Sequence, residues 1–406
     1  MDLELKPRRL SGAVTPPPSK SQAHRLILCA ALAEGTSSLH NIYLSEDVSA
    51  TLACAGALGA RCEAHGGGEL RVTGIGGKAP SSAQPRFDCG ESGSTLRFFL
   101  PAALAVRGGG VFTGRGRLMR RPQKPYFDLF DEKGIAWRQE GDTLTVAGTL
   151  PAGVYRLPGN VSSQFFTGLL LALPLAEGES EIRATTALES ADYIAMTLDA
   201  LSLAGVESEG EDGRWLVRPQ AFRPFEAAVE ADWSQAAFWI AARFLGNELT
   251  VEGLNAASRQ GDRRIAAFAG RLAAPGDLVL DVTQCPDLVP PLAAMAALRE
   301  GSCRIEGAAR LRLKESDRLA SVTAALRALG AEIREEPDAL VLRGVKSLRG
   351  GAVDCCGDHR IAMMAAVAAT RCEGGSVKLF GADCVKKSYP DFWEVYERLG
   401  GECHVL

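Results

Sequence analysis

The feature that most constrains this chain is an internal repeat. Apolar helical segments rich in small residues begin at Ser21, Ser94, Ser163 and Ser234, so consecutive starts are separated by 73, 69 and 71 residues. Two more segments of this kind follow, LVPPLAAMAALREG from Leu288 and HRIAMMAAVAATRCEG from His359. A period of about 70 residues predicts six similar units and therefore a repeated architecture.

Each unit repeats one order of elements. A short β-like run such as EIRATT, ELTVEG or CRIEG follows the apolar helix, and a second helix then ends in Leu-Gly or a near variant. The stretch around Leu272 is a degenerate version of this second helix. Helices that are hydrophobic on nearly every face belong in a core. The pattern predicts an α/β fold in which sheets enclose helices, with three units in each of two lobes.

The boundary between the lobes is predicted near Val229, because Pro219, Pro224 and an acidic stretch interrupt the pattern there. The leading strand of about 19 residues is assigned to the second half. The predicted lobes are residues 20–228, and residues 1–19 together with 229–406, joined by two crossings. Residues 66–80 read as a hairpin with a loop.

Composition excludes several classes of protein. Hydrophobic residues make up 46% and charged residues 23%, and no apolar run has the roughly 20 residues that span a bilayer. The N-terminus MDLELKPRRL lacks the apolar core of a secretion signal, so a cytoplasmic location is expected. A net charge of −4 gives no general field for nucleic acid.

The cysteines predict neither disulfides nor a metal site. There are 11 of them, scattered without a CxxC pair, which favours reduced thiols. Cys355 and Cys356 followed by His359 form the closest group, but their spacing fits no common metal site. No metal is predicted.

Polar residues concentrate where the helices begin. At the apolar helices these are Lys20, Ser21, Arg25, Gly93, Ser94, Arg97, Ser162, Ser163, Gln164, Asp287, Asp358, His359 and Arg360. At the second helices they are Arg121, Lys124, Ser190, Tyr193, Lys314, Glu315, Arg318, Lys387 and Ser388. Ser and Asp are favoured N-caps, and capping is the preferred interpretation of Ser234, Asp262 and Asp391.

Cations at helix starts need a different explanation, because they oppose the helix dipole. Lys20, Arg121, Lys314, Arg360 and Lys387 flank glycine and serine more than acidic partners, which favours an anion site over a solvated charged face. Arginine suits bidentate contact with carboxylate or phosphate, whereas lysine supplies a point charge or a proton. The pattern predicts a substrate with several negative charges.

Two acids stand out within this basic set, Asp287 before Pro290-Pro291 and Glu315 within KESDR. Each alone is explained by capping or by an ion pair. As a pair in a basic cleft, they suit removal and donation of a proton.

The residues resemble the EPSP synthase family across essentially the whole chain. The segments that carry the resemblance are PSKSQAHR, GESGSTLR, LMRRP, VSSQF, ESADYI, DLVPPLAAMAA, LKESDRL, GDHRIAM and KKSYPDF, in that order. The resemblance implies a two-lobed inside-out α/β barrel, each lobe built from three βαβαββ units with buried helices. It also implies that the lobes close over the ligands and that no cofactor is needed.

The resemblance further implies two sets of substrate-binding residues. For shikimate 3-phosphate they are Lys20, Ser21, Arg25, Ser162, Ser163, Gln164, Ser190, Tyr193, Asp287 and Lys314. For phosphoenolpyruvate they are Lys20, Gly93, Arg121, Gln164, Arg318, Arg360 and Lys387.

The implied reaction is addition followed by elimination. The 5-hydroxyl of shikimate 3-phosphate attacks C2 of phosphoenolpyruvate while C3 is protonated, and the tetrahedral intermediate then loses phosphate. Asp287 is the implied base on the hydroxyl, Glu315 the implied acid toward C3, and Lys20 a third catalytic residue. A monomer is expected, because closure of two lobes within one chain suffices for catalysis.

The chain departs from many relatives at two positions, with Glu91 and Arg310 where they have asparagine. Because each position exchanges a neutral group for a charge, we predict that the two side chains approach each other in the closed state. Gly93 is retained, which predicts that glyphosate, the family's inhibitor, still binds.

Two other functions compete with this interpretation. One is the sister enzyme that transfers enolpyruvyl to UDP-N-acetylglucosamine, although the SSQ, KESDR and DHR segments fit a phosphorylated shikimate better. The other is a repeat scaffold that binds anions without catalysis, which leaves the pair Asp287 and Glu315 unexplained.

Overall fold

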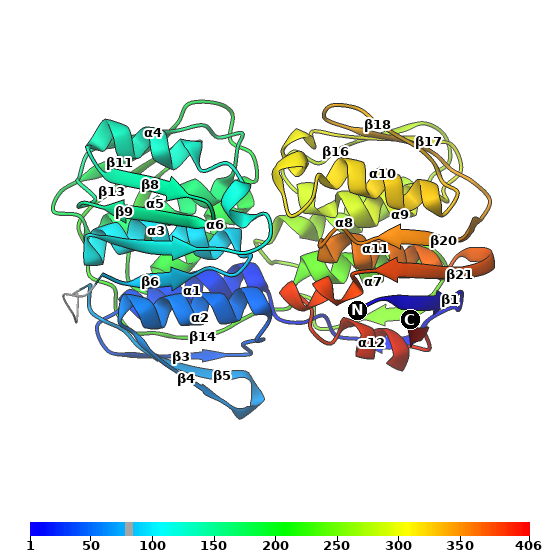
Figure 1. Cartoon of the computed structure of the whole chain (residues 1–406), viewed down its shortest axis with the longest axis horizontal. Helices are drawn as coiled ribbons and strands as arrows, with labels where there is room; N and C mark the ends of the chain where they lie inside the picture. Colours follow the sequence, from blue (N-terminus) through cyan, green and yellow to red (C-terminus); the bar gives the residue numbers. More distant parts are fainter. Residues whose placement is uncertain (78–83) are drawn as a thin grey trace. The chain divides into compact units, whose positions relative to one another are not determined.

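The computed structural model describes residues 1–77 and 84–406, and its contacts divide the chain into two compact units (Figure 1). The inserted unit is Pro18–Glu230, and the terminal unit comprises Met1–Pro17 and Ala231–Leu406. The predicted junctions stood at 19/20 and 228/229, whereas the contacts change at 17/18 and 230/231. Of the predicted hairpin, residues 78–80 lie outside the described residues.

The inserted unit contains four-stranded sheets with the orders β14-β3-β5-β4, β6-β7-β9-β8 and β10-β11-β13-β12. Their strands are β3 (Thr36–His40), β4 (Arg61–His65), β5 (Glu69–Thr73), β6 (Arg86–Asp88), β7 (Gly109–Thr113), β8 (Ala136–Glu140), β9 (Thr143–Ala147), β10 (Val154–Leu157), β11 (Ser180–Ala184), β12 (Ser208–Glu211), β13 (Arg214–Val217) and β14 (Glu226–Ala228). The helices are α1 (Lys20–Leu32), α2 (Glu46–Leu58), α3 (Gly93–Arg107), α4 (Lys124–Lys133), α5 (Ser163–Ala172) and α6 (Ala191–Leu203).

The terminal unit contains sheets with the orders β20-β21-β1-β22, β16-β17-β19-β18 and β15-β2. Their strands are β1 (Leu3–Lys6), β2 (Ser11–Val14), β15 (Glu248–Val251), β16 (Leu278–Asp281), β17 (Ser302–Glu306), β18 (Glu332–Glu335), β19 (Leu340–Arg343), β20 (Leu348–Asp354), β21 (Cys372–Phe380) and β22 (Glu402–Val405). The helices are α7 (Trp233–Phe244), α8 (Ile265–Leu272), α9 (Val289–Ala296), α10 (Arg318–Ala328), α11 (His359–Ala369) and α12 (Phe392–Arg398).

The predicted repeat is confirmed as a βαβαββ unit. In the copy β6-α3-β7-α4-β8-β9, the first two strands pair in parallel and the last two add as antiparallel strands. Three copies are completed by a strand that is distant in sequence, and in one of them β2, near the N-terminus, pairs in parallel with β15. Strand β14, at the end of the inserted unit, pairs with β3 near its start, and β1, at the N-terminus, lies between β21 and β22 near the C-terminus.

One copy is shorter than the others, as the degenerate stretch around Leu272 predicted. Its sheet has only the parallel pair β15 and β2, and α8 is followed within a few residues by β16. Within the described residues, this copy therefore lacks the closing antiparallel pair of strands that the four-stranded sheets possess.

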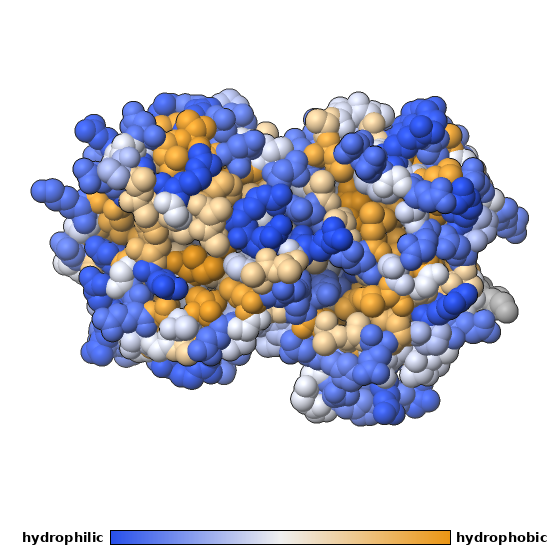
Figure 2. Space-filling view, turned by 180° about the vertical axis from the view of Figure 1, so that it is seen from behind, coloured by the Kyte–Doolittle hydropathy of each residue, from blue (hydrophilic) through white to orange (hydrophobic). Residues whose placement is uncertain are grey.

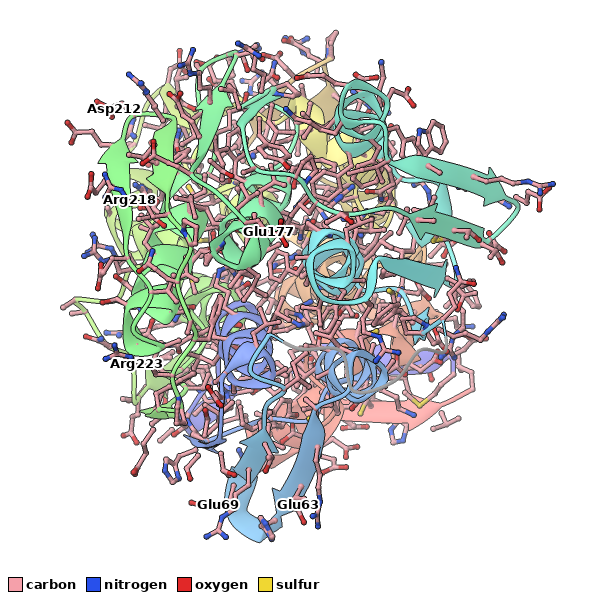
Figure 3. All side chains as sticks on the ribbon, turned by 90° about the vertical axis from the view of Figure 1, so that its left-hand side faces the viewer. Glu63, Glu69, Glu177, Asp212, Arg218 and Arg223 are labelled. Atoms are coloured by element: carbon pink, nitrogen blue, oxygen red, sulfur yellow. The ribbon has the colours of Figure 1, made fainter. Side chains whose placement is uncertain are left out.

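Sheets enclose the apolar helices, as their composition predicted. Every residue of α11 is buried, and ten residues of α1 are buried. Figure 3 views the inserted unit, with helices in its interior, the labelled Glu63 and Glu69 on outer strands, and Asp212 and Arg218 just outside the ends of β12 and β13. On the face shown in Figure 2, hydrophobic residues form separate patches among hydrophilic ones. Within the described residues, none of the helices combines the length and the apolar character needed to cross a membrane.

Candidate active site

In the terminal unit, the guanidinium of Arg318 binds three carboxylates. Its Nη1 donates to Asp287 at 2.8 Å, its Nη2 to Glu315 at 2.6 Å, and its Nε to Asp358 at 2.9 Å. The Arg318 side chain is 1% exposed, so these bonds form away from water. Because the fork of N–H donors is rigid, one arginine fixes both predicted acid–base residues, Asp287 and Glu315, beside each other.

Asp287, in the 3₁₀ turn Pro286–Leu288, also lies among other cations. Arg360 Nη2 is 3.3 Å from its Oδ2, and Lys314 Nζ is 3.4 Å from its Oδ1. Burial alone would raise the pKa of Asp287, but Arg360, Lys314 and Arg318 together hold it well below the usual value. The carboxylate is therefore ionised. An anionic ligand that neutralises part of this positive charge would increase its affinity for a proton.

The start of α11 adds an anion-binding element. Asp358 caps this helix by accepting from Arg360 N at 3.0 Å, and its carboxylate also accepts from Ser316 Oγ at 3.0 Å. Lys387, at the end of the 3₁₀ helix Ala382–Lys387, donates from Nζ to the Gly357 carbonyl at 2.7 Å. A helix N-terminus with Arg360 and Lys387 beside it provides N–H donors and positive charge for a phosphate or carboxylate.

The predicted capping roles of Ser234 and Asp262 are wrong. Asp232 is the N-cap of α7 and accepts from the backbone N–H of Ser234 at 2.7 Å. The Ser234 hydroxyl is left for another partner, and it donates to Asp262, which lies in the 3₁₀ turn Gly261–Arg264. Asp391 occupies the N-cap position of α12, but its side chain makes no capping bond.

In the inserted unit, Gln164 is held by two residues from the start of α3. Arg97 Nη1 donates to Gln164 Oε1 at 2.6 Å, and Gln164 Nε2 donates to Ser94 Oγ at 3.0 Å. Arg97 Nη2 also donates to the Pro122 carbonyl at 3.0 Å. These bonds tie the start of α3 to the start of α5, so two predicted helix starts meet.

Arg121 lies against Gly93 at the start of α3. A Cβ added at Gly93 would lie 3.0 Å from Arg121 Nη1 and 3.1 Å from Cζ. The guanidinium therefore occupies space that only glycine leaves open. Arg121 is buried, which favours strong electrostatic contact with an anion.

Lys20 and Arg25 open α1 but have different surroundings. Lys20 Nζ forms an ion pair with Asp47 Oδ2 at 2.6 Å. Arg25 is buried, and it donates to the carbonyls of Ser21 at 2.6 Å and Tyr193 at 2.9 Å. Burial lowers the pKa of Arg25 to about 10. Arg25 thus joins the start of α1 to the start of α6, where Tyr193 lies.

The three predicted serines lie at the starts of α5 and α6. Ser162 caps α5 by accepting from Gln164 N at 3.3 Å, and Ser163 is the first residue of that helix. Ser190 precedes α6 with a φ of 56°, a left-handed conformation that is uncommon for serine. Its carbonyl accepts from Tyr193 N at 3.2 Å. Strain of this kind concentrates at binding sites.

Glu91 and Arg310 belong to different units, so their predicted approach stays a prediction. Glu91 packs against Gly116, where an added Cβ would meet its carboxylate. Arg310 is buried and donates from Nη2 to the Thr283 carbonyl.

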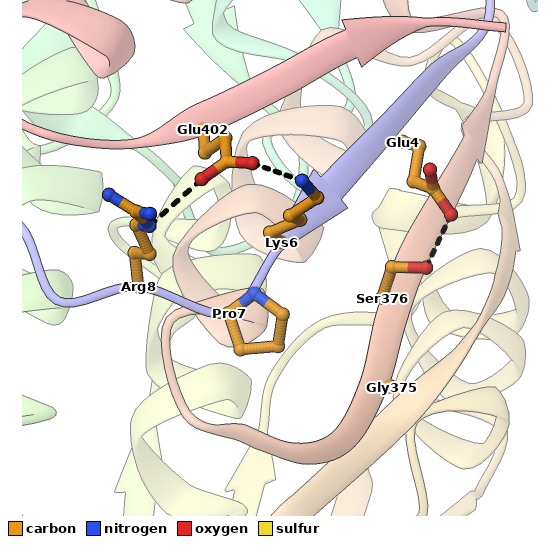
Figure 4. Close-up of a pocket in the computed structure, with 7 residues that line it drawn as sticks. All are labelled: Glu4, Lys6, Pro7, Arg8, Gly375, Ser376 and Glu402. Carbon is orange, nitrogen blue, oxygen red and sulfur yellow. Dashed lines mark hydrogen bonds and ion pairs between the residues drawn. The ribbon is translucent and has the colours of Figure 1, made fainter.

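Outside these networks, the described residues offer few other polar clusters that resemble a binding site. Over residues 1–77 and 84–406, no group of three His, Cys, Asp or Glu side chains could hold a metal ion. A surface pocket beside β1 and β22 is lined by charged groups that pair with one another (Figure 4). There Arg8 contacts Glu402 at 2.9 Å, Lys6 contacts the same carboxylate, and Ser376 donates to Glu4 at 2.6 Å.

Sequence reasoning missed three residues of these networks. Asp358 was predicted only as part of a helix start, although its carboxylate accepts a hydrogen bond from Arg318. Arg97 was also predicted at a helix start, but not as the hydrogen-bond partner of Gln164. The GDHR and GSTLR segments did contain the signal. Asp47, by contrast, lies in the first turn of α2, where an acid is explained by the helix dipole alone.

Comparisons with known proteins agree over nearly the whole chain. A family model described as EPSP synthase (3-phosphoshikimate 1-carboxyvinyltransferase) matches residues 5–396. A 3-phosphoshikimate 1-carboxyvinyltransferase of Clostridium acetobutylicum is 42% identical over 422 residues, covering 99% of this chain and 98% of the relative. That of Clostridium kluyveri is 41% identical over 419 residues, covering 98% of this chain and 97% of the relative.

Solved structures share the fold. EPSP synthase from Acinetobacter baumannii superimposes with a TM-score of 0.81 at 24% identity and covers 100% of both chains. The enolpyruvyl transferase NikO from Streptomyces tendae gives a TM-score of 0.77 at 16% identity, covering 99% of this chain and 98% of that one.

Proposed function

The chain belongs to the EPSP synthase family, and on that premise we propose how its residues transfer the enolpyruvyl group of phosphoenolpyruvate to shikimate 3-phosphate. This transfer releases phosphate and is a step of the shikimate pathway toward aromatic amino acids. The curated relatives carry the name of this activity, so transfer to UDP-N-acetylglucosamine is not favoured.

One observation carries the assignment of the catalytic residues, namely that Asp287 and Glu315 share Arg318 while Arg360 and Lys314 surround Asp287. Asp287 accepts the proton of the 5-hydroxyl as the hydroxyl oxygen bonds to C2 of phosphoenolpyruvate. Glu315 gives a proton to C3, and the tetrahedral intermediate forms. In the elimination, C3 loses a proton and the bond from C2 to the phosphate oxygen breaks, giving the enol ether product and phosphate.

Each unit supplies part of the anion-binding set. From the inserted unit we assign Ser162, Ser163, Gln164, Ser190, Tyr193, Ser21 and Arg25 to shikimate 3-phosphate, and Gly93 and Arg121 to phosphoenolpyruvate. From the terminal unit we assign Arg318, Arg360 and Lys387 to phosphoenolpyruvate, and Lys314 and Asp287 to the acceptor. Lys20 and Gln164 serve both ligands. Cations that hold the departing phosphate stabilise the charge that develops as the C2–O bond breaks.

The low pKa of Asp287 fits this order of events. In the free protein, positive groups keep the carboxylate ionised and make it a weak base. When phosphoenolpyruvate occupies Arg360 and shikimate 3-phosphate occupies Lys314, part of that positive charge is neutralised. Asp287 then becomes a stronger base at the moment when the acceptor hydroxyl is bound.

The activity is tested by measuring phosphate released from phosphoenolpyruvate with shikimate 3-phosphate, with UDP-N-acetylglucosamine, or with no acceptor. We expect release only with shikimate 3-phosphate. Asp287→Asn and Glu315→Gln, which keep size and remove the charge, should each lower turnover by about a hundredfold or more. Release with the nucleotide sugar alone would overturn the assignment. If neither of the two acceptors leads to phosphate release, the chain would be a binding scaffold and not an enzyme.

We also propose that glyphosate binds at the phosphoenolpyruvate groups. Its phosphonate and carboxylate suit the same cations, and the retained Gly93 leaves room for the Arg121 guanidinium beside it. The expected result is inhibition that rising phosphoenolpyruvate overcomes. Unchanged turnover at high glyphosate concentration would refute this proposal.

The proposed location is the cytoplasm, and the proposed assembly state is a monomer. Phosphoenolpyruvate is an intracellular metabolite, and one chain carries both groups of binding residues. Fractionation of cells and light scattering of the purified protein test these two statements.

A further inference from the structure

In the terminal unit, buried hydrogen bonds connect Arg360, which lies beside Asp287, through Ser234 to Asp262. Arg360 Nη2, which lies 3.3 Å from Asp287 Oδ2, donates to Ser234 Oγ at 2.8 Å. Ser234 Oγ in turn donates to Asp262 Oδ2. Asp262 is 2% exposed, Arg360 6% and Ser234 8%, so water has little room to replace these contacts.

The order of donors fixes the direction of the Ser234 hydroxyl. An ionised Asp262 can only accept, so it takes the one hydroxyl proton and leaves the oxygen lone pairs for Arg360. The backbone at this point is held independently, because Asp232 accepts from the N–H of Ser234 at 2.7 Å and of Gln235 at 3.0 Å. The contact with Asp262 is therefore not needed to start α7.

The buried carboxylate of Asp262 lowers the stability of the folded protein. Among the described residues, its Oδ1 has no hydrogen-bond partner. Burial, followed by the negative charge of Asp287, raises the pKa of Asp262 to about 6, while Arg360 and Ser234 oppose this rise. A buried, half-satisfied carboxylate destabilises a protein unless it has another use.

Other charged groups also lie near Asp262. Asp232, at the start of α7, adds a further negative charge that raises the pKa of Asp262. On its own turn, Arg263 donates to the Ala256 carbonyl at 3.3 Å and Arg264 to the Gly261 carbonyl at 3.2 Å. Arg360 is the cation whose charge lowers the pKa of Asp262.

We propose that Asp262 and Ser234 are positioning residues that hold the Arg360 guanidinium in the orientation in which it binds an anionic group of phosphoenolpyruvate beside Asp287. This inference rests on the proposed function, because it takes Arg360 as a ligand of phosphoenolpyruvate. Asp262 acts through Ser234, and neither residue contacts the reacting atoms.

Steady-state kinetics with Asp262→Ala, Ser234→Ala and the double variant test the proposal at pH 8. Each single variant should lower kcat/KM for phosphoenolpyruvate by roughly tenfold to a hundredfold, the range for losing one hydrogen bond to a charged group. The loss should be mainly in KM for phosphoenolpyruvate, with the Kd of shikimate 3-phosphate unchanged within about twofold. The double variant should lose no more than the worse single variant, because the residues act in series.

Two conservative changes separate positioning from a merely structural contact. Ser234→Thr keeps the hydroxyl and should recover most of the activity that Ser234→Ala loses. Asp262→Asn removes only the charge, so the ratio of wild-type to variant kcat/KM should grow as the pH rises through about 6. The ratio cancels the titration of the substrate phosphates, which is common to both proteins.

The chain offers a matched control in the same unit. Ser302 Oγ donates to Asp277 Oδ1 at 2.6 Å, and this pair is exposed, whereas Ser234 and Asp262 are buried. Asp277→Ala and Ser302→Ala should keep kcat/KM within about twofold of wild type. Thermal unfolding checks that every variant is folded, and Asp262→Asn and Ser234→Ala still carry the test if Asp262→Ala does not fold.

The outcomes distinguish this inference from the proposed function. If the wild type releases no phosphate with shikimate 3-phosphate, the proposed function fails. If the wild type is active but the Asp262 and Ser234 variants match the controls, or their losses are additive, the positioning role is overturned. A pH-independent ratio for Asp262→Asn would also overturn it.

Discussion

Arg318 bonds three carboxylates at once because its guanidinium presents N–H donors in a fixed plane. Arg318→Lys keeps the positive charge but cannot reach Asp287, Glu315 and Asp358 together. We predict a destabilisation of about 3 kcal/mol, since the buried Asp358 and the partly buried Asp287 and Glu315 lose a shared donor, and a fall in kcat of about a hundredfold. Urea unfolding and phosphate release measure these two effects.

The matched control for this change is Arg312→Lys. Arg312 also bonds carboxylates, Asp317 at 3.0 Å and Glu335 at 3.3 Å, but its side chain is 31% exposed. It should lose less than about 1 kcal/mol. Equal losses in the two variants would contradict the special role of Arg318.

Gly93→Ala tests the contact between α3 and Arg121. The added methyl would lie 3.0 Å from Arg121 Nη1, so the guanidinium must shift. We predict that KM for phosphoenolpyruvate rises roughly tenfold while the melting temperature changes little. Gly270→Ala in α8 is the control, because an added Cβ there meets nothing within 4 Å, and it should leave KM unchanged.

His24 gives the inserted unit a pH-dependent stability. Burial, together with the positive charges of Lys20 and Arg25, lowers its pKa well below 6.5. Below about pH 6.5 the unfolded chain binds a proton that the folded chain does not, so stability falls as pH falls, by at most about 1.4 kcal/mol per pH unit. His24→Asn should remove this slope between pH 6.5 and 5 in urea unfolding, whereas exposed His65→Asn should not. An unchanged slope in His24→Asn would refute this assignment.

At this scale the sequence predicts which residue types gather, but not their partners. Lys314, Arg360 and Asp287 were predicted from their places at helix starts, and the structure brings them together. Arg318 reaches Asp287 from 31 residues away and Asp358 from 40, and such distances along the chain carry no local signal. The Ser234 and Asp262 pair was misread for the same reason, since capping is the local explanation.

At the scale of elements, the two-stranded sheet β15-β2 should be the least protected sheet of the terminal unit. Isolated two-stranded pairs are marginal, whereas β16-β17-β19-β18 has neighbours for its inner strands. We predict that hydrogen exchange, followed by mass spectrometry, is faster in peptides covering β15 and β2 than in those covering β17 and β19. Equal protection would show that other contacts replace the missing hairpin.

The elements themselves were the most predictable level. Apolar helices predicted from Ser21, Ser94 and Ser234 begin one residue earlier, at Lys20, Gly93 and Trp233. The Leu-Gly endings are confirmed as helix stops, because Gly59, with φ of 123°, and Gly330, with φ of 88°, adopt conformations that suit glycine. Pairing between β14 and β3, or between β1 and β21, depends on strands too distant in sequence for periodicity to reveal.

At the scale of the whole molecule, the inserted unit contains all the strands of its own sheets. We therefore predict that residues 18–230 expressed alone fold cooperatively, with a single thermal transition in circular dichroism. Residues 231–406 alone lack β1 and β2, so their sheets remain incomplete and they should unfold at lower temperature than in the full chain. A stable fold of 231–406 equal to that of the full chain would contradict this.

The position of β1 between β21 and β22 has a consequence for the order of synthesis. Strand β1 is synthesised long before its hydrogen-bonding partners β21 and β22, whereas all strands of the inserted unit are synthesised between them. Leu3 and Leu5, which are buried in the folded protein, therefore lack their partner strands while the middle of the chain folds. Because Leu3 pairs with Val405, the two chain ends are neighbours, and a circular permutant opened at the junction of the units could make β1 beside its partners.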